Sequence, residues 1–139
     1  MDGRTDVDLG GARRIVGGRC RGKEALPKEK IMTITKKDLF AGISDHLKEE
    51  LMETILQTST FRIERIVSQG HSSKEGFWYD QSDNELVILL KGNATLRFEN
   101  QFQLIKMKPG DYINIEKHVR HRVEWTNPEL DTIWLAVHY

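Results

Sequence analysis

The feature that most constrains the fold is a series of short apolar segments that fills the chain from residue 61 to residue 139. Turn signals separate them, among them Gly92-Asn93, Asn100-Gln101 and Pro109-Gly110-Asp111. Seven strands in fewer than 80 residues, with no long helix between them, predict a small antiparallel β-barrel or sandwich. The predicted strands are FRIERIV, ELVILL, ATLRFE, FQLIKM, DYINI, VRHRVEW and TIWLAVHY.

The first 31 residues have a different composition. Residues 1–30 hold six of the eleven glycines, eight basic residues against five acidic ones, and no aromatic residue. Such a segment buries too little apolar surface to offset its ordering entropy, so residues 1–31 are predicted to form a disordered tail. Met32 could then be the true start of translation.

Residues 32–60 are predicted to form a helical lead-in to the barrel domain of residues 61–139. The stretch DHLKEELMETILQ, residues 45–57, carries a stripe of apolar side chains at helical spacing, with Ser44 as its N-cap. One short N-terminal helix is therefore expected before the β-rich part. The apolar stripe consists of Leu47, Leu51, Met52, Ile55 and Leu56.

Composition excludes several classes of protein. Lysine plus arginine equals aspartate plus glutamate at 21 each, so no whole-chain basic field argues for binding to nucleic acid. No apolar run approaches the roughly 20 residues of a membrane-spanning helix, and no signal peptide is evident. The single cysteine, Cys20, excludes an internal disulfide and a multi-cysteine zinc site. A reducing, cytoplasmic location is expected.

Two stretches, ELVILLKG and KMKPGDYINIEKHVRHRVEW, resemble the two motifs of the cupin superfamily in its small single-domain form. Glu85 and Gly92 match the second half of the first motif. Pro109-Gly110-Asp111 and His121 match the second motif. The resemblance covers about residues 61–139 and implies an all-β, jelly-roll type barrel. It is less specific for function, since this fold hosts isomerases, oxygenases, storage proteins and sugar-binding regulators.

The resemblance implies a metal site formed by two histidines, a glutamate and a later histidine. Here the paired-histidine positions hold Tyr79 and Gln81 or, with a longer spacer, Trp78 and Asp80. Strand parity favours the first alignment, because Tyr79, Gln81 and Glu85 would share a face. The expected metal ligands are therefore Gln81, Glu85 and His121, with His118 or His71 as additions. Iron, manganese, nickel, copper or zinc would suit such donors, and a metal-free site is equally credible.

The same alignment predicts an amphipathic pocket suited to a small organic ligand. Two histidines are assigned no chemistry: His138, on the last strand, is interpreted as structural, and His46 as a solvated side chain. The predicted pocket residues are Tyr79, Gln81, Glu85, His121, Trp78 and Trp125.

Three hypotheses for function remain open. The first is a small-molecule binding protein with an atypical divalent-metal site. The second is a metal-dependent isomerase or oxygenase, in which the metal activates water or oxygen or polarises a carbonyl. The third is a metal-free structural or regulatory domain in which Glu85 and His121 pair. The resemblance also implies a homodimer, because small cupins commonly pair.

Overall fold

Eight strands make up the regular structure of the chain, in a computed structural model that describes residues 32–139. No helix occurs within that range, and the predicted tail, residues 1–31, lies outside the described residues. Seven of the strands fall on the seven segments predicted from the sequence. The strands are β1 (Leu51–Gln57), β2 (Arg62–Ser68), β3 (Glu85–Lys91), β4 (Ala94–Phe98), β5 (Ile105–Met107), β6 (Tyr112–Ile115), β7 (His121–Thr126) and β8 (Thr132–His138).

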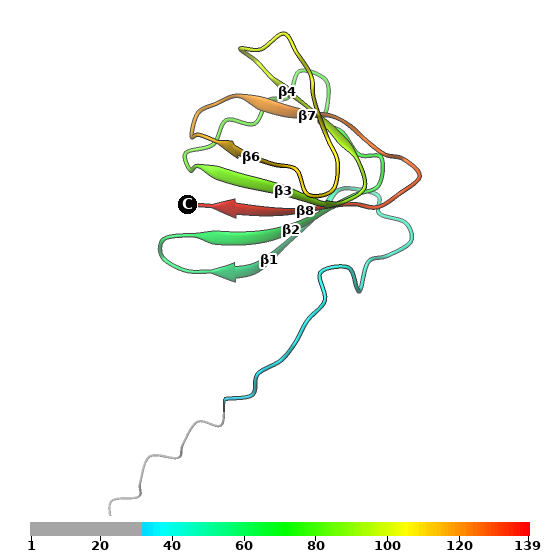
Figure 1. The fold of residues 1–139 in the computed structure, drawn as a ribbon, viewed down its shortest axis with the longest axis vertical. Helices are drawn as coiled ribbons and strands as arrows, with labels where there is room; N and C mark the ends of the chain where they lie inside the picture. The colour runs from blue at the N-terminus through cyan, green and yellow to red at the C-terminus, as the bar shows by residue number, and fades with distance from the viewer. Residues whose placement is uncertain (1–31) are drawn as a thin grey trace, which may run out of the picture. The chain divides into compact units, whose positions relative to one another are not determined.

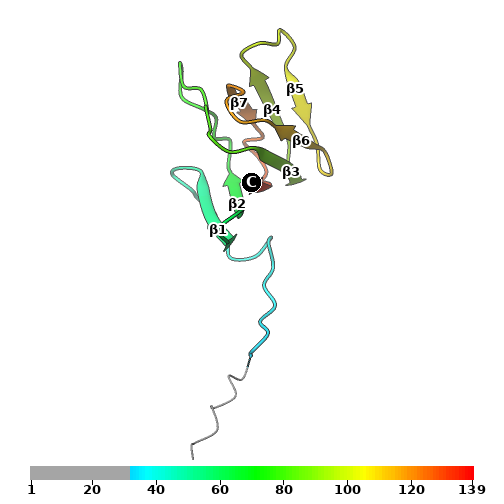
Figure 2. The ribbon, with the colours of Figure 1, turned by 90° about the vertical axis from the view of Figure 1, so that its left-hand side faces the viewer.

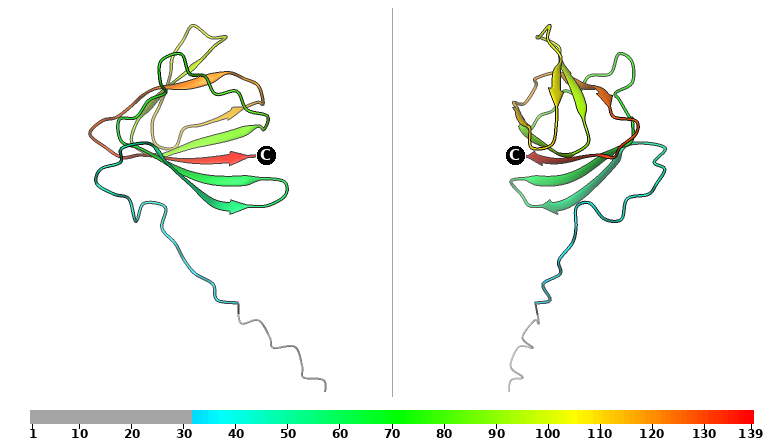
Figure 3. Two further views of the ribbon diagram at one scale, coloured as in Figure 1. Left: turned by 180° about the vertical axis from the view of Figure 1, so that it is seen from behind. Right: turned by 45° about the vertical axis from the view of Figure 1, so that its right-hand side comes forward.

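The strands form two antiparallel sheets. The larger has the order β1-β2-β8-β3-β6 and the smaller has the order β5-β4-β7. Figure 1 shows β1, β2, β8 and β3 side by side in that order, with β4 and β7 beyond β6. From behind (Figure 3, left), the C-terminal end of β8 lies between β2 and β3, in the middle of the larger sheet. The all-β prediction is thus confirmed.

Alternation of side chains explains the core between the sheets. In β3, Glu85, Val87 and Leu89 are buried while the residues between them are half-buried, so the period-2 pattern sets the inner face. Burying apolar side chains such as Val87 and Leu89 stabilises the fold by about 2 kcal/mol each. The core cluster contains Val87, Leu89, Ala94, Leu96, Phe98, Met107, Ile115 and Trp134.

The predicted helix over residues 45–57 is wrong, because residues 51–57 form the edge strand β1, paired antiparallel with β2. The spacing looked helical because apolar side chains lie on both faces of this strand. Met52 pairs with Ile66, which also lines the cavity described below, whereas Leu51 pairs with Val67 on the opposite face. A β-bulge between Thr54 and Leu56 adds one residue and further breaks the alternation.

Gly92 allows the turn between β3 and β4. Its φ is +82°, a conformation that side-chain-bearing residues rarely adopt. A Cβ placed there would lie 2.6 Å from the Cα of Thr132 and 2.7 Å from the carbonyl oxygen of Asp131. The glycine therefore serves both the turn and the close approach of the chain leading into β8.

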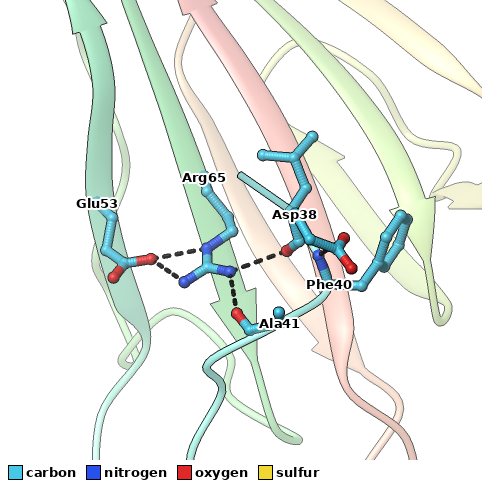
Figure 4. Close-up of polar contacts among 6 residues, drawn as sticks. Asp38, Phe40, Ala41, Glu53 and Arg65 are labelled. Carbon is cyan, nitrogen blue, oxygen red and sulfur yellow. Dashed lines mark hydrogen bonds and ion pairs between the residues drawn. The ribbon is translucent and has the colours of Figure 1, made fainter. Parts of the chain in front are cut away.

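Arg65 ties the segment before β1 to the larger sheet. Its guanidinium pairs with Glu53 on β1 and donates to the carbonyl oxygens of Leu39, at 2.9 Å, and Ala41, at 2.8 Å (Figure 4). Only 8% of Arg65 is exposed, so the charge is buried with its partners in place. The outer face of β2 is thereby covered at this point.

The β4–β5 hairpin lies far from the β1–β2 edge in the side view (Figure 2). Residues 36–139 form one compact unit. Within the described part of the chain, no helix is long and apolar enough to span a membrane.

Candidate functional site

A cavity of about 510 Å³ lies between the inner faces of the two sheets. Cross-strand register builds its polar side, since Arg62, His138, Glu85 and Ile115 are consecutive partners across β2, β8, β3 and β6. The lining residues are Glu50, Met52, Arg62, Glu64, Ile66, Tyr79, Asp80, Gln81, Ser82, Asp83, Glu85, Val87, Leu96, Ile115, His121, Val123, Trp134 and His138. The cavity thus combines an apolar floor with a dense set of ionisable groups.

His121, at the start of β7, is held in a defined orientation. Its ring stacks against Tyr79 at a centroid distance of 5.5 Å and against Phe98 at 5.8 Å. Its Nδ1–H donates to the carbonyl oxygen of Val119 at 2.9 Å. The neutral imidazole therefore carries its proton on Nδ1, which leaves Nε2 as an acceptor.

Glu85 faces this acceptor without bonding to it. The distance from Glu85 Oε2 to His121 Nε2 is 3.6 Å, longer than a hydrogen bond. Among residues 32–139, Glu85 Oε2 has no hydrogen-bond partner, although only 7% of the residue is exposed. A buried carboxylate oxygen beside an imidazole lone pair is costly unless a proton, a cation or a ligand donor lies between them.

A second glutamate–histidine pair lies on the larger sheet, and both oxygens of its carboxylate are bonded. His138 Nε2 is 3.1 Å from Glu64 Oε2, and Arg62 Nε donates to Glu64 Oε1 at 2.8 Å. His138 is the cross-strand partner of Glu85, so the two pairs are neighbours. Sequence reasoning assigned His138 a structural role and did not single out Arg62 or Glu64. The alternation of Arg62, Glu64 and Ile66 was the signal that could have placed them on the inner face.

Two further groups titrate in this environment. Burial raises the pKa of Glu50, against the opposing effects of its hydrogen bond from Ser68 and of nearby His71. Burial also raises the pKa of the Tyr79 phenol, and the negative charges of Glu50 and Glu85 raise it further. Ser68 in turn accepts the indole N–H of Trp134 at 3.2 Å. The cavity wall is therefore partly desolvated and negative.

The donor set for a metal ion is incomplete by the usual standard of the fold. No three histidine, cysteine, aspartate or glutamate side chains gather for a metal within the described range. The buried atom Gln81 Oε1 also lacks a partner among those residues, and Gln81 lines the same cavity as Glu85 and His121. One imidazole nitrogen and two oxygens fit a divalent cation, and the Nδ1–H bond of His121 is the usual support for a ligating histidine.

The remaining predicted pocket residues lie elsewhere. Tyr79 bridges to His121 through backbone hydrogen bonds and faces inward, so its neighbour Trp78 faces the other way, where Arg120 and Arg122 lie 5.9 Å from its ring. Trp125 is 44% exposed and lines a separate depression between β4 and β5. A bulge between Thr95 and Leu96 shifts the β4–β7 register before Trp125, so alternation counted from His121 fails there.

The two additional candidate ligands do not line this cavity. The imidazole of His118 is largely exposed and pairs with Asp80 at 3.0 Å on the rim. The Nδ1 atom of His71 accepts the backbone N–H of Gln69 at 2.9 Å. His118 has a φ of +63° in the turn that precedes β7.

Comparison with known proteins places this architecture in a family. The Cupin_2 cupin domain matches residues 66–138, and the chain belongs to that family. The chain is similar to a protein of Ralstonia eutropha JMP134 described as a "putative mannose-6-phosphate isomerase", with 37% sequence identity and a TM-score of 0.73. That match covers 76% of this chain and 97% of the other.

More distant structures share the fold alone. A cupin superfamily protein of Desulfitobacterium hafniense is 18% identical with a TM-score of 0.56, over 69% of this chain and 82% of the other. An RmlC-like cupin of Methanocaldococcus jannaschii with a double-stranded β-helix fold is 18% identical with a TM-score of 0.55, over 70% and 85%. Among curated proteins, none matches the sequence significantly.

Proposed function

We propose that the cavity binds a small polar molecule at a divalent cation held by Gln81, Glu85 and His121. The observation that carries this proposal is Glu85 Oε2, which is buried, has no hydrogen-bond partner in the described part of the chain and lies 3.6 Å from the acceptor Nε2 of His121. A cation between these atoms would remove their repulsion and satisfy both. When bound, it would act as a Lewis acid toward a carbonyl or hydroxyl oxygen of the ligand. The apolar floor formed by Val87, Leu96 and Trp134 would hold the carbon skeleton.

The test is metal binding by the purified full-length chain. We expect stoichiometric uptake of one or more of iron, manganese, nickel, copper or zinc, with a rise in melting temperature. Glu85→Gln and His121→Ala should each lose the metal, whereas the matched variants Glu129→Gln and His46→Ala, at exposed positions, should retain it. Absence of uptake and of any thermal shift for all five metals contradicts the proposal. It would favour the metal-free alternative, in which a protonated His121 pairs with Glu85.

A second candidate function is sugar isomerisation, in which a proton moves between neighbouring carbons of an aldose or ketose. The 37% identity to the Ralstonia eutropha protein supports it. The cavity also supplies two carboxylate–imidazole pairs, the kind of groups that transfer protons. Incubating the metal-loaded protein with mannose or mannose 6-phosphate, and assaying the corresponding ketose, tests this candidate. Glu85→Gln should abolish any conversion, and conversion that survives the variant would contradict the assigned role.

We also propose a homodimer formed through the outer face of the larger sheet. This face carries exposed Leu56 (49%) and Tyr112 (69%). Between them lie half-buried Ile63, Leu86, Ile88, Leu135 and Val137. A contiguous apolar patch of this kind favours association. Light scattering should give twice the chain mass of 16.1 kDa, and Tyr112→Asp should lower it toward one chain. A wild-type protein of single-chain mass would contradict the proposal.

A further inference from the structure

The cavity wall has a strong excess of negative charge. Five of its lining residues are carboxylates, Glu50, Glu64, Asp80, Asp83 and Glu85, against one guanidinium, Arg62. With the histidines neutral, the formal charge of the lining is therefore −4. The whole chain is neutral, so acidity is concentrated at this place.

The one guanidinium in the described wall is already engaged. Arg62 Nε donates to Glu64 at 2.8 Å, and the other oxygen of Glu64 bonds to His138 at 3.1 Å. No lysine lines the cavity within residues 32–139. The described wall of the cavity therefore offers an incoming anion no free lysine or arginine side chain.

The two buried cavity-lining atoms that lack hydrogen-bond partners among the described residues are both acceptors. Among residues 32–139, Glu85 Oε2 is an acceptor without a partner on a residue that is only 7% exposed, and Gln81 Oε1 is a second such acceptor. These acceptors require hydrogen-bond donors or cations from the ligand.

We propose that the cavity selects small molecules whose polar groups are neutral hydroxyls or cationic amines and excludes anions, including phosphate esters. This inference rests on the proposed function, because it takes the cavity to be the binding site. A divalent cation bound at Glu85 would lower the excess of negative charge by two without reversing it. The ligand class is thus an unphosphorylated polyol or an amine-bearing polyol. It differs from the phosphorylated sugar in the printed description of the Ralstonia eutropha protein.

The decisive experiment measures the charge selectivity of the cavity without any ligand or metal. A thiol is introduced as Met52→Cys in a Cys20→Ser background, because Met52 lines the cavity and is 51% exposed. Two methanethiosulfonate reagents of similar size, one with a trimethylammonium group and one with a sulfonate, are then reacted with it. The reference is Phe102→Cys in the same background, because Phe102 is fully exposed in the loop between β4 and β5 and lies outside the cavity and the proposed dimer face.

We expect the ratio of cationic to anionic reaction rates to be about tenfold higher at the cavity thiol than at the reference thiol at low salt. The thiol's own acidity affects both reagents alike and cancels in the ratio. Adding Asp83→Asn should lower the ratio at the cavity thiol, whereas Glu129→Gln, outside the cavity, should leave it unchanged. A ratio at or below the reference, or one that Asp83→Asn does not lower, overturns the inference.

The preference for ligand charge is tested with three sugars that share one carbon skeleton and are cationic, neutral or anionic. Mannosamine and mannose should each slow the reaction of the cavity thiol with the reagents more than mannose 6-phosphate does. Stronger protection by the phosphate ester overturns the inference. The reagent ratio needs neither metal nor substrate, so its failure is distinguishable from a failure of the proposed metal site, which metal analysis alone decides.

Discussion

Two glutamate–histidine pairs lie side by side in one cavity, and they differ in whether their hydrogen bonds are complete. Glu64 bonds to both His138 and Arg62, at 3.1 and 2.8 Å. Glu85 stands 3.6 Å from His121 and leaves Oε2 without a partner among the described residues. Both histidines are buried, at 7% and 6% exposure. We call the first pair the closed pair and the second the open pair. The closed pair holds the wall through its hydrogen bonds, and the open pair is the one that we propose contacts a ligand.

Removing the closed pair should have the largest effect on stability. Glu64→Ala leaves His138 and Arg62 without their carboxylate, and we expect a loss of about 2 kcal/mol in the free energy of unfolding. Urea unfolding measures it, with Glu129→Ala as the exposed control. A loss no greater than that of the control would show that the closed pair does not stabilise the sheet.

Neutralising the open pair should affect binding far more than stability. In Glu85→Gln the free energy of unfolding should change by less than about 1 kcal/mol, because the lost oxygen has no partner to leave behind. Affinity for the divalent metal should fall about tenfold or more, as measured by calorimetry. A large loss of stability with unchanged metal affinity would reverse the roles of the two pairs.

The smallest expected effect concerns Glu50, which extends the comparison to a third carboxylate of the cavity, one that accepts a hydrogen bond from Ser68. Its pKa is raised in the folded state, chiefly by burial, so its carboxyl favours folding below the unfolded pKa and loses that contribution as pH rises through the folded pKa. Glu50→Gln should therefore be more stable than the wild type at neutral pH and lose this advantage in acid. Urea unfolding at several pH values tests the sign, and an advantage that grows in acid would contradict it.

The sequence predicted the strands well because alternation and turn residues act locally. The seven segments from residue 61 onward all contain strands, and the match of Glu85, Gly92 and His121 to cupin motifs led to the correct family. The segment at residues 51–57 was misassigned because an edge strand with apolar side chains on both faces lacks the alternation of a one-sided strand. A periodic pattern is used to infer burial, but in this strand only Leu51 is half-buried and the other apolar side chains are exposed.

The candidate site was less predictable than the fold, because cross-strand register is a property of pairing between distant segments. Placing Glu64 beside His138 requires knowing that β2 pairs with β8, 74 residues apart at the bonded atoms. The outward position of Trp125 depends on a bulge in the pairing of β4 with β7, and no local sequence pattern predicts that bulge. The acceptor character of His121 depends on a single carbonyl, that of Val119.

That carbonyl belongs to the turn before β7, where His118 takes a left-handed conformation. Because the turn decides which ring nitrogen of His121 carries the proton, it decides whether the atom opposite Glu85 gives or receives a hydrogen bond. Insertions or substitutions at residues 116–120 can therefore change what the cavity recognises while every wall residue keeps its identity. Divergence among relatives of this protein can thus begin in a loop outside the lining of the cavity.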